Sequence, residues 1–208
     1  MVEPISSGIA HNIPICNFVI DEFENIIHFK VRYKKKNLTE NLKHLIKDHI
    51  NFPVKGIIFK DILPLLQDPN IFAKVIEEMS NSPIFKNADA IISIDARGFI
   101  FGTAISFYLS KPMVVARKPG KLPGKLIQKT YDLEYGSNSL AIQEESIKPY
   151  KSFAIVDDLL ATGGTVQCVA EILNDSCKEI SGLSVVIELG ELCGRDKFKF
   201  PVESNIVL

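Results

Sequence analysis

The sequence has little of the chemistry on which several enzyme classes depend. It contains no tryptophan and only four cysteines, none of them in a CxxC pair: Cys16, Cys168, Cys177 and Cys193. Scattered cysteines favour free thiols in a reducing compartment over disulfides or a zinc site. No histidine follows residue 49. A Ser-His-Asp hydrolase or a zinc deaminase would need its histidine from the least motif-like part of the chain, so we set both classes aside.

Long apolar runs and an excess of one charge are also missing. No run approaches the roughly 18 apolar residues of a membrane span, and the N-terminus has no basic stretch of the kind that opens a secretory signal. The formal net charge of -1 argues against a general polyanion binder. We therefore expect a cytoplasmic protein without a membrane or nucleic-acid partner. Its 208 residues, 46% of them hydrophobic, suffice for one domain with an appendage.

Residues 1–36 read as an N-terminal extension of unknown role, and residues 37–208 as the main domain. In the extension, apolar residues alternate with polar ones from Ile27 to Tyr33, which predicts a half-buried strand. The basic run 32–36 is interpreted as a solvated hinge rather than a nucleic-acid patch. Asn37 and Glu40 resemble a capping box, which predicts a helix through about Ile50.

The main domain alternates short apolar runs with helical stretches. Strands are predicted at 90–94, 112–116, 153–156 and 183–189. Helices are predicted around 72–79, 98–109 and 166–173. This alternation indicates an α/β fold with a doubly wound, mainly parallel sheet that is covered on both faces. In such sheets ligands bind beyond the carboxyl ends of the strands, where unusual polar residues are therefore informative.

The strongest motif runs from Ile155 to Thr165, IVDDLLATGGT. An apolar strand leads into the adjacent carboxylates of Asp157 and Asp158, and a loop of small residues then opens a helix. Such a loop brings backbone N–H groups and a helix N-terminus to an anion, while paired carboxylates can bind a vicinal diol. The alternative, a plain strand-to-helix turn, does not explain two adjacent carboxylates. The loop matches neither GxxxxGK[ST] nor GxGxxG.

Two further polar clusters follow strands. Asp95-Ala96-Arg97-Gly98 comes after the strand 90–94, and alone it could be a capped helix with a surface arginine. Residues 117–131 hold five basic residues and no acidic one, with Pro and Gly breaking regular structure in the first half. A solvated loop is the ordinary interpretation of such a run. Beside a phosphate-binding motif, it suits instead a flexible lid for a polyanionic ligand.

These motifs resemble a known family. IVDDLLATGGT resembles the phosphoribosyl pyrophosphate (PRPP) motif of the type I phosphoribosyltransferases. Four further segments are similar to signatures of the adenine-specific branch, in family order: FPVKGIIFKD at 52–61, DARGF at 95–99, RKPGKLPG at 117–124 and YDLEYG at 131–136. The resemblance spans about residues 42–192 and implies that family's fold, with a flexible lid loop and a small base-binding hood.

The resemblance also implies roles for individual residues. Those expected to bind the ribose and 5-phosphate of PRPP are Asp157, Asp158, Ala161, Thr162, Gly163, Gly164 and Thr165. Those expected to bind pyrophosphate are Asp95, Ala96, Arg97, Arg117, Lys118 and Lys121. Those expected to bind adenine are Ile58, Phe59, Lys60 and Leu189, with main-chain groups of Ile58 and Lys60 reading the base edge. Glu134 is the expected catalytic residue, which would assist proton transfer from the purine.

The implied reaction is purine salvage, in which adenine and PRPP give AMP and pyrophosphate. Mg²⁺ is expected as cofactor, bound mainly through PRPP, so no side chain is assigned as a metal ligand. The family carries a non-proline cis peptide where Asp95-Ala96 lies, and it forms homodimers; we expect both here. Lys55 and Lys60 stand where the family usually has Pro and Arg, and the extension has no counterpart that we can match.

Two alternatives stay open at this point. A transcriptional regulator can keep this fold as a PRPP sensor, but the 36-residue extension is short for a DNA-binding module and lacks helix-turn-helix spacing. An enzyme of the same fold can act on a 6-oxopurine, against which the segment 52–61 and the lid sequence argue. DNA retention at moderate salt tests the first alternative, and a panel of purines tests the second.

Overall fold

The computed structural model describes residues 15–20, 26–32, 38–133 and 136–208, which fall into two units, Met1–Asn37 and Leu38–Leu208. In the first unit, β1 (Ile15–Ile20) pairs antiparallel with β2 (Ile26–Arg32). The strand predicted from Ile27 onward is therefore present, because alternating apolar residues suit a strand with one covered face. The predicted hinge at 33–36 lies outside the described residues.

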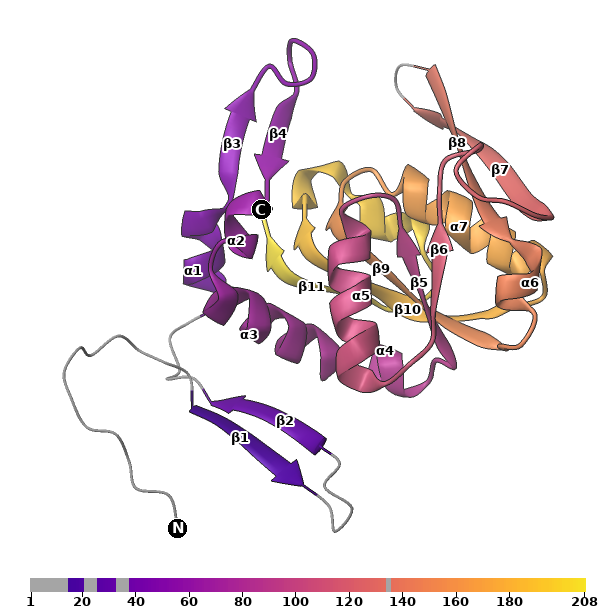
Figure 1. The fold of residues 1–208 in the computed structure, drawn as a ribbon. Helices are drawn as coiled ribbons and strands as arrows, with labels where there is room; N and C mark the ends of the chain where they lie inside the picture. Colours follow the sequence, from indigo (N-terminus) through magenta and orange to yellow (C-terminus); the bar gives the residue numbers. More distant parts are fainter. Residues whose placement is uncertain (1–14, 21–25, 33–37, 134–135) are drawn as a thin grey trace, which may run out of the picture. The chain divides into compact units, whose positions relative to one another are not determined.

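The second unit is built on a five-stranded parallel sheet in the order β11-β10-β9-β5-β6 (Figure 1). Its strands are β5 (Ala90–Ile94), β6 (Met113–Ala116), β9 (Ser152–Leu160), β10 (Glu179–Glu188) and β11 (Val202–Val207). The prediction of a doubly wound α/β fold is confirmed. Edge strand β11 was not predicted, because Glu203, Ser204 and Asn205 interrupt its apolar pattern.

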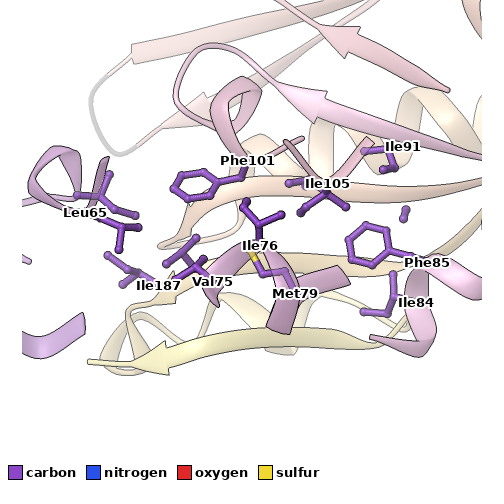
Figure 2. Close-up of a cluster of buried hydrophobic side chains, with 14 of the residues drawn as sticks. Leu65, Val75, Ile76, Met79, Ile84, Phe85, Ile91, Phe101, Ile105 and Ile187 are labelled. Carbon is purple, nitrogen blue, oxygen red and sulfur yellow. The ribbon is translucent and has the colours of Figure 1, made fainter. Parts of the chain in front are cut away.

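Alternate residues of the central strands supply two separate cores. Ile91 and Val156 pack with the helices α3 (Pro69–Ser80) and α5 (Gly98–Leu109), whereas Ile92 and Ile155 pack with α7 (Gly164–Asp175). Figure 2 shows part of the first core, where side chains of α3 and α5 meet. Because both faces are buried, the strands read as continuous apolar runs. The predicted helices 72–79, 98–109 and 166–173 are all present.

Shorter helices complete the second unit. They are α1 (Leu38–Leu45), α2 (Leu63–Leu66), α4 (Pro83–Lys86) and α6 (Glu144–Ile147). The prediction that the first of these runs through Ile50 was wrong. Residues Lys47–Ile50 form β3, which pairs antiparallel with β4 (Ile58–Asp61). Pairing with a strand that follows in the chain overrides the local helical pattern here, and the turn between them contains Gly56 at φ 94°.

A second hairpin joins β7 (Leu126–Leu133) to β8 (Gly136–Gln143). The predicted irregular part of the lid is present before it, with Gly120 and Gly124 at φ 78° and 81°. These two values lie in the left-handed region, which explains glycine at both positions. The regular hairpin that follows was not predicted, because its strands alternate too weakly between apolar and polar residues.

Candidate active site

The candidate site lies where the strand order reverses. The chain passes from β5 to β6 in one direction, and then from β9 to β10 and β11 in the other, so the switch point falls between β5 and β9. Pairing of β5 with β9 ends at Ser93 and Val156, whereas β10 continues to pair with β9 as far as Leu160. The last residues of β9 therefore have a neighbour on one side only. Ligands bind at such switch points in doubly wound sheets.

A cavity of about 260 Å³ occupies this position. Ten predicted site residues line it together: Asp95, Ala96, Arg97, Asp157, Asp158, Ala161, Thr162, Gly163, Gly164 and Thr165. Apolar or main-chain neighbours that we did not predict complete the lining: Ile94, Leu159, Leu160 and Val166. Motifs about 60 residues apart in the sequence thus share one cavity, while the ligands assigned to them stay predictions.

The loop between β9 and α7 forms one wall of this cavity. Gly163 has φ 80° and precedes the first residue of α7, Gly164, so the loop turns directly into the N-terminus of a 12-residue helix. Unpaired N–H groups and the helix dipole make this end favourable for an anion. The hydroxyl of Thr165 lies 3.2 Å from that of Tyr131 on β7, a contact that the sequence did not reveal.

The two carboxylates are held differently. The Oδ1 atom of Asp157 accepts a hydrogen bond of 2.9 Å from the backbone N–H of Asp158. The Oδ2 atom of Asp158 is buried without a hydrogen bond and lies 2.9 Å from Nε of Arg97 as an ion pair. Burial raises the pKa of Asp157 well above 3.8, and the charge of Asp158 raises it further. Burial also raises the pKa of Asp158, while Arg97 opposes that shift.

A glycine allows the second wall to approach these carboxylates. A Cβ atom on Gly98 would lie 2.7 Å from Oδ1 of Asp157 and 3.2 Å from the carbonyl oxygen of Val156. Without it, the first turn of α5 packs directly against the end of β9. The preceding peptide bond between Asp95 and Ala96 is cis, as we expected from the resemblance.

The basic residues of the lid do not line the cavity. Nε of Arg117 lies 2.9 Å from Oδ2 of Asp95, and its guanidinium stands 5.6 Å from the ring centroid of Phe99. Arg117 thus reaches the edge of the site through a cavity residue. Lys118 and Lys121 are exposed on the irregular part of the lid. The predicted cluster of positive charge is therefore only partly assembled at the cavity.

Arg97 also connects the cavity to the β3–β4 hairpin. Its guanidinium carbon stands 4.9 Å from the ring centroid of Phe59, and its terminal nitrogen donates to the carbonyl of Lys60 at 3.3 Å. In an antiparallel strand, the N–H and C=O of one residue point to the same side, which residues two apart share. Main-chain groups of Lys60 and Ile58 therefore face the free edge of β4, towards Arg97.

The remaining predicted residues are placed less directly. The side chain of Lys60 is turned to Asp48 on β3, with Nζ and Oδ2 2.8 Å apart. The backbone N–H of Leu189 donates to the carbonyl of Leu160 at 2.8 Å, which puts Leu189 beside the end of β9. Glu134 lies outside the described residues. Within the described ranges, no cluster of three or more His, Cys, Asp or Glu side chains could hold a metal ion by itself.

Comparisons with known proteins agree with this architecture. Residues 64–197 match the family model of the phosphoribosyl transferase domain. An adenine phosphoribosyltransferase of Prochlorococcus marinus is 62% identical over 170 residues, which cover 82% of this chain and 99% of that protein. The crystal structure of the Thermoanaerobacter pseudethanolicus adenine phosphoribosyltransferase has a TM-score of 0.77 and 37% identity, covering 82% of this chain and 99% of that one.

A third comparison involves bound ligands. The Saccharomyces cerevisiae adenine phosphoribosyltransferase, solved with an imino-altritol bisphosphate and adenine, has a TM-score of 0.75 and 34% identity over 81% of this chain and 98% of its own. The family model covers well over half of this chain. Relatives whose length this chain covers almost completely are more than half identical to it. The chain belongs to the phosphoribosyltransferase family and, within it, to the adenine phosphoribosyltransferases.

Proposed function

We propose that this protein transfers the 5-phosphoribosyl group of PRPP to adenine, which yields AMP and pyrophosphate and salvages the purine. The cavity at the switch point carries the proposal, because it joins a phosphate-binding loop, a carboxylate pair and the Asp95–Arg97 turn. The relative from S. cerevisiae was solved with adenine and a bisphosphate. Incubation with PRPP, Mg²⁺ and each of adenine, guanine, hypoxanthine and xanthine tests it, with AMP formation from adenine as the expected result.

Each part of the cavity has a proposed role in this reaction. The C1–oxygen bond of PRPP breaks, its electron pair leaves with pyrophosphate, and a ring nitrogen of adenine forms the new bond to C1. Asp157 and Asp158 accept hydrogen bonds from the ribose hydroxyls, and the loop Ala161–Thr165 binds the 5-phosphate. As positive charge develops on the ribose ring, the same carboxylates would stabilise it.

Pyrophosphate is proposed to bind at the other wall. Backbone groups of Asp95, Ala96 and Arg97 would contact it, and closure of the lid would add the charges of Lys118 and Lys121. Arg117 would contribute once it exchanges its partner Asp95 for the leaving group. Glu134, which the lid sequence carries, is the proposed group that takes up the proton lost by adenine.

The proposed cofactor is Mg²⁺. This ion prefers carboxylate, phosphate and water oxygens, and usually combines one or two carboxylates with substrate phosphates. The cavity has three acidic side chains whose chemistry suits such an ion, those of Asp95, Asp157 and Asp158, although Asp95 and Asp158 are each paired with an arginine. The oxygens of PRPP are expected to supply most of its ligands. When bound, the ion would neutralise charge on the departing pyrophosphate.

The protein is further proposed to act as a homodimer in the cytoplasm. The described cysteine side chains, Cys168, Cys177 and Cys193, are free, as is typical of reducing compartments. No described helix is long and apolar enough to span a bilayer. Helix α5 offers an interface, since Phe107 and Tyr108 near its end are 87% and 45% exposed. Large exposed aromatic side chains are enriched in protein interfaces.

Replacing Phe107 should weaken this dimer. In Phe107→Glu, an aromatic anchor becomes a charge, and we expect a loss of about 2 kcal/mol or more, roughly 30-fold in the dimer dissociation constant. Sedimentation velocity over a dilution series measures the change, and Phe107→Leu is the matched apolar control. A wild-type protein that stays monomeric at micromolar concentration would refute the dimer, and an unchanged constant in Phe107→Glu would refute this interface.

The N-terminal extension is proposed to be dispensable for catalysis. Deletion of residues 1–36 leaves every residue of the candidate site in place, since the unit Leu38–Leu208 contains them all. We expect kcat and both KM values of the truncated protein to stay within about threefold of the full chain, a difference below 1 kcal/mol. Loss of turnover in a truncated protein with native far-ultraviolet circular dichroism and native oligomeric state would show that the extension completes the site.

A further inference from the structure

A segment that belongs to none of the predicted motifs packs against the loop between β9 and α7. After β10, two short 3₁₀ helices, Gly190–Leu192 and Gly194–Lys197, return the chain to the end of β9. Gly194 is buried there. A Cβ atom on it would overlap the carbonyl oxygen of Ala161 and come within 3.2 Å of the amide nitrogen of Gly163. The two backbones are therefore packed against each other with no room for a side chain.

The contact is reciprocal. A Cβ atom on Gly163 would lie 2.9 Å from the carbonyl oxygen of Gly194 and 3.0 Å from the ring of Phe198. Gly163 has a positive φ, which independently favours glycine, whereas Gly194 is not among the residues with positive φ. Glycine at position 194 is thus explained by close approach to the loop and not by its own backbone conformation. The segment 194–198 therefore packs directly against residues 161–163 of the loop.

An ion pair between Arg195 and Glu188 holds the segment 194–198 against the end of β10. Nε and the second terminal nitrogen of Arg195 donate to the two carboxylate oxygens of Glu188 at 2.6 and 2.5 Å, and Ser204 donates to the same carboxylate at 3.0 Å. Glu188 is 4% exposed at the end of β10, where it is paired with Leu160 of β9. The hydrogen bonds from Arg195 lower the pKa of Glu188, which favours the ionised carboxylate at neutral pH. Two-point Arg–carboxylate contacts fix orientation as well as distance.

From this arrangement we infer that Gly194 and the Glu188–Arg195 pair are positioning residues for the 5-phosphate. They fix the position and orientation of the loop whose N–H groups bind that phosphate. The inference rests on the proposed function, in which the loop Ala161–Thr165 holds that phosphate. Backbone N–H groups stabilise an anion most strongly when their directions are set before it arrives, because no reorganisation is then needed. Arg195 and Glu188 are bound to each other and act through Gly194, so neither needs to touch the substrate.

The test compares two glycines of the same segment. Gly194→Ala must force the segment and the loop backbone apart, whereas Gly190→Ala places its Cβ 3.0 Å from a side-chain methyl of Val207, which can shift. The probe is ribose 5-phosphate, measured by calorimetry, with pyrophosphate as a second ligand that the loop is not expected to bind. Binding rather than turnover is measured, so the result can be read whether or not adenine is the accepted base.

We expect Gly194→Ala to weaken ribose 5-phosphate binding about 10- to 100-fold, which corresponds to losing one hydrogen bond to a charged group. Pyrophosphate binding, and both ligands with Gly190→Ala, should stay within about twofold of the wild type. Unchanged ribose 5-phosphate affinity in a folded Gly194→Ala protein would overturn the inference. So would an equal loss for the two ligands, because that would indicate general damage to the site.

A second set of variants tests the ion pair. Arg195→Met should weaken ribose 5-phosphate binding, and Arg195→Lys should restore part of it, since lysine keeps the charge without the two-point contact. The double variant Glu188→Gln/Arg195→Met removes both charges, so no unpaired carboxylate stays buried. Weak binding that persists in the double variant would support a positioning role. Wild-type binding there would show that Arg195 only neutralises Glu188, and would overturn this part of the inference.

Discussion

The kcat/KM for adenine is expected to exceed that for hypoxanthine by about 10⁴- to 10⁵-fold, the largest effect that we predict. Adenine presents an N–H donor beside the N1 acceptor, and hypoxanthine presents the reverse pattern. Main-chain groups of Ile58 and Lys60 share the free edge of β4, and a carbonyl and an N–H two residues apart can read such a pair. The wrong purine would leave these groups unpaired, at the cost of their desolvation.

Side chains on β4 should contribute unequally to this selectivity. Lys60→Arg should keep both rate and preference, because the Lys60 side chain is bound to Asp48 and the reading groups are main-chain. Phe59→Ala should weaken adenine binding by about 1–3 kcal/mol through the lost stacking face. The guanidinium of Arg97 stands over the Phe59 ring, so it must either move or occupy the opposite face when adenine stacks there.

Steady-state kinetics with both purines at saturating PRPP provide the measurement. Lys60→Arg serves as the control for Phe59→Ala, since the two residues are adjacent and only Phe59 presents an aromatic face. A ratio near unity in the wild type would mean that another part of the chain selects the base. A ratio that collapses in Lys60→Arg would assign the reading to the side chain instead.

The second large effect concerns the carboxylates at the end of β9. Asp157→Asn and Asp158→Asn each remove a charged acceptor from a ribose hydroxyl, worth about 1.5–3 kcal/mol, so PRPP affinity should fall about 10- to 100-fold. In Asp158→Asn, Arg97 also loses its ion-pair partner. Calorimetric titration with PRPP and Mg²⁺ measures the loss. Asp175→Asn changes the charge equally on an exposed part of α7 and should leave affinity unchanged.

The substitution Asp157→Asn, which should lower PRPP affinity, should raise the stability of the fold. Burial and the neighbouring carboxylate raise the pKa of Asp157 above 3.8, so this group lowers the stability of the fold increasingly as the pH rises above 3.8, and by the full amount above the raised pKa. This destabilisation disappears as the pH falls towards 3.8 and the carboxyl group takes up its proton. Asp157→Asn is therefore expected to raise the Tm of the ligand-free protein at pH 7, and the gain should shrink as the pH is lowered.

Two outcomes would contradict this assignment. Wild-type PRPP affinity in the double variant Asp157→Asn/Asp158→Asn would show that the ribose is bound elsewhere. A Tm that falls at pH 7 in Asp157→Asn would show that the carboxylate stabilises the ligand-free fold, contrary to the cause given for its raised pKa. Affinity and stability moving in opposite directions is the expected pattern for a functional group held in an unfavourable environment.

Local sequence patterns were sufficient for the parts of the protein that depend on local chemistry. The strand Ala90–Ile94 and the helix Gly98–Leu109 were predicted with the bounds that the structure shows, because apolar period and terminal glycine are local signals. The small-residue turn Ala161–Thr165 between strand and helix was predicted for the same reason, since its residues are consecutive, and its binding of the 5-phosphate stays a prediction. Motif positions after strands also predicted that distant segments would share one cavity.

Only the tertiary structure decided which side chains contact one another. The helix predicted through Ile50 gives way to a strand because β4 pairs with it, and no local pattern carries that information. The ion pair of Arg97 with Asp158, and its contact with Phe59, join segments that are far apart in the chain. The sequence alone gives no reason for glycine at position 194, which only its contact with Ala161 explains. Such contacts depend on how the sheet brings strand ends together, and that follows from packing the whole chain rather than from any single segment.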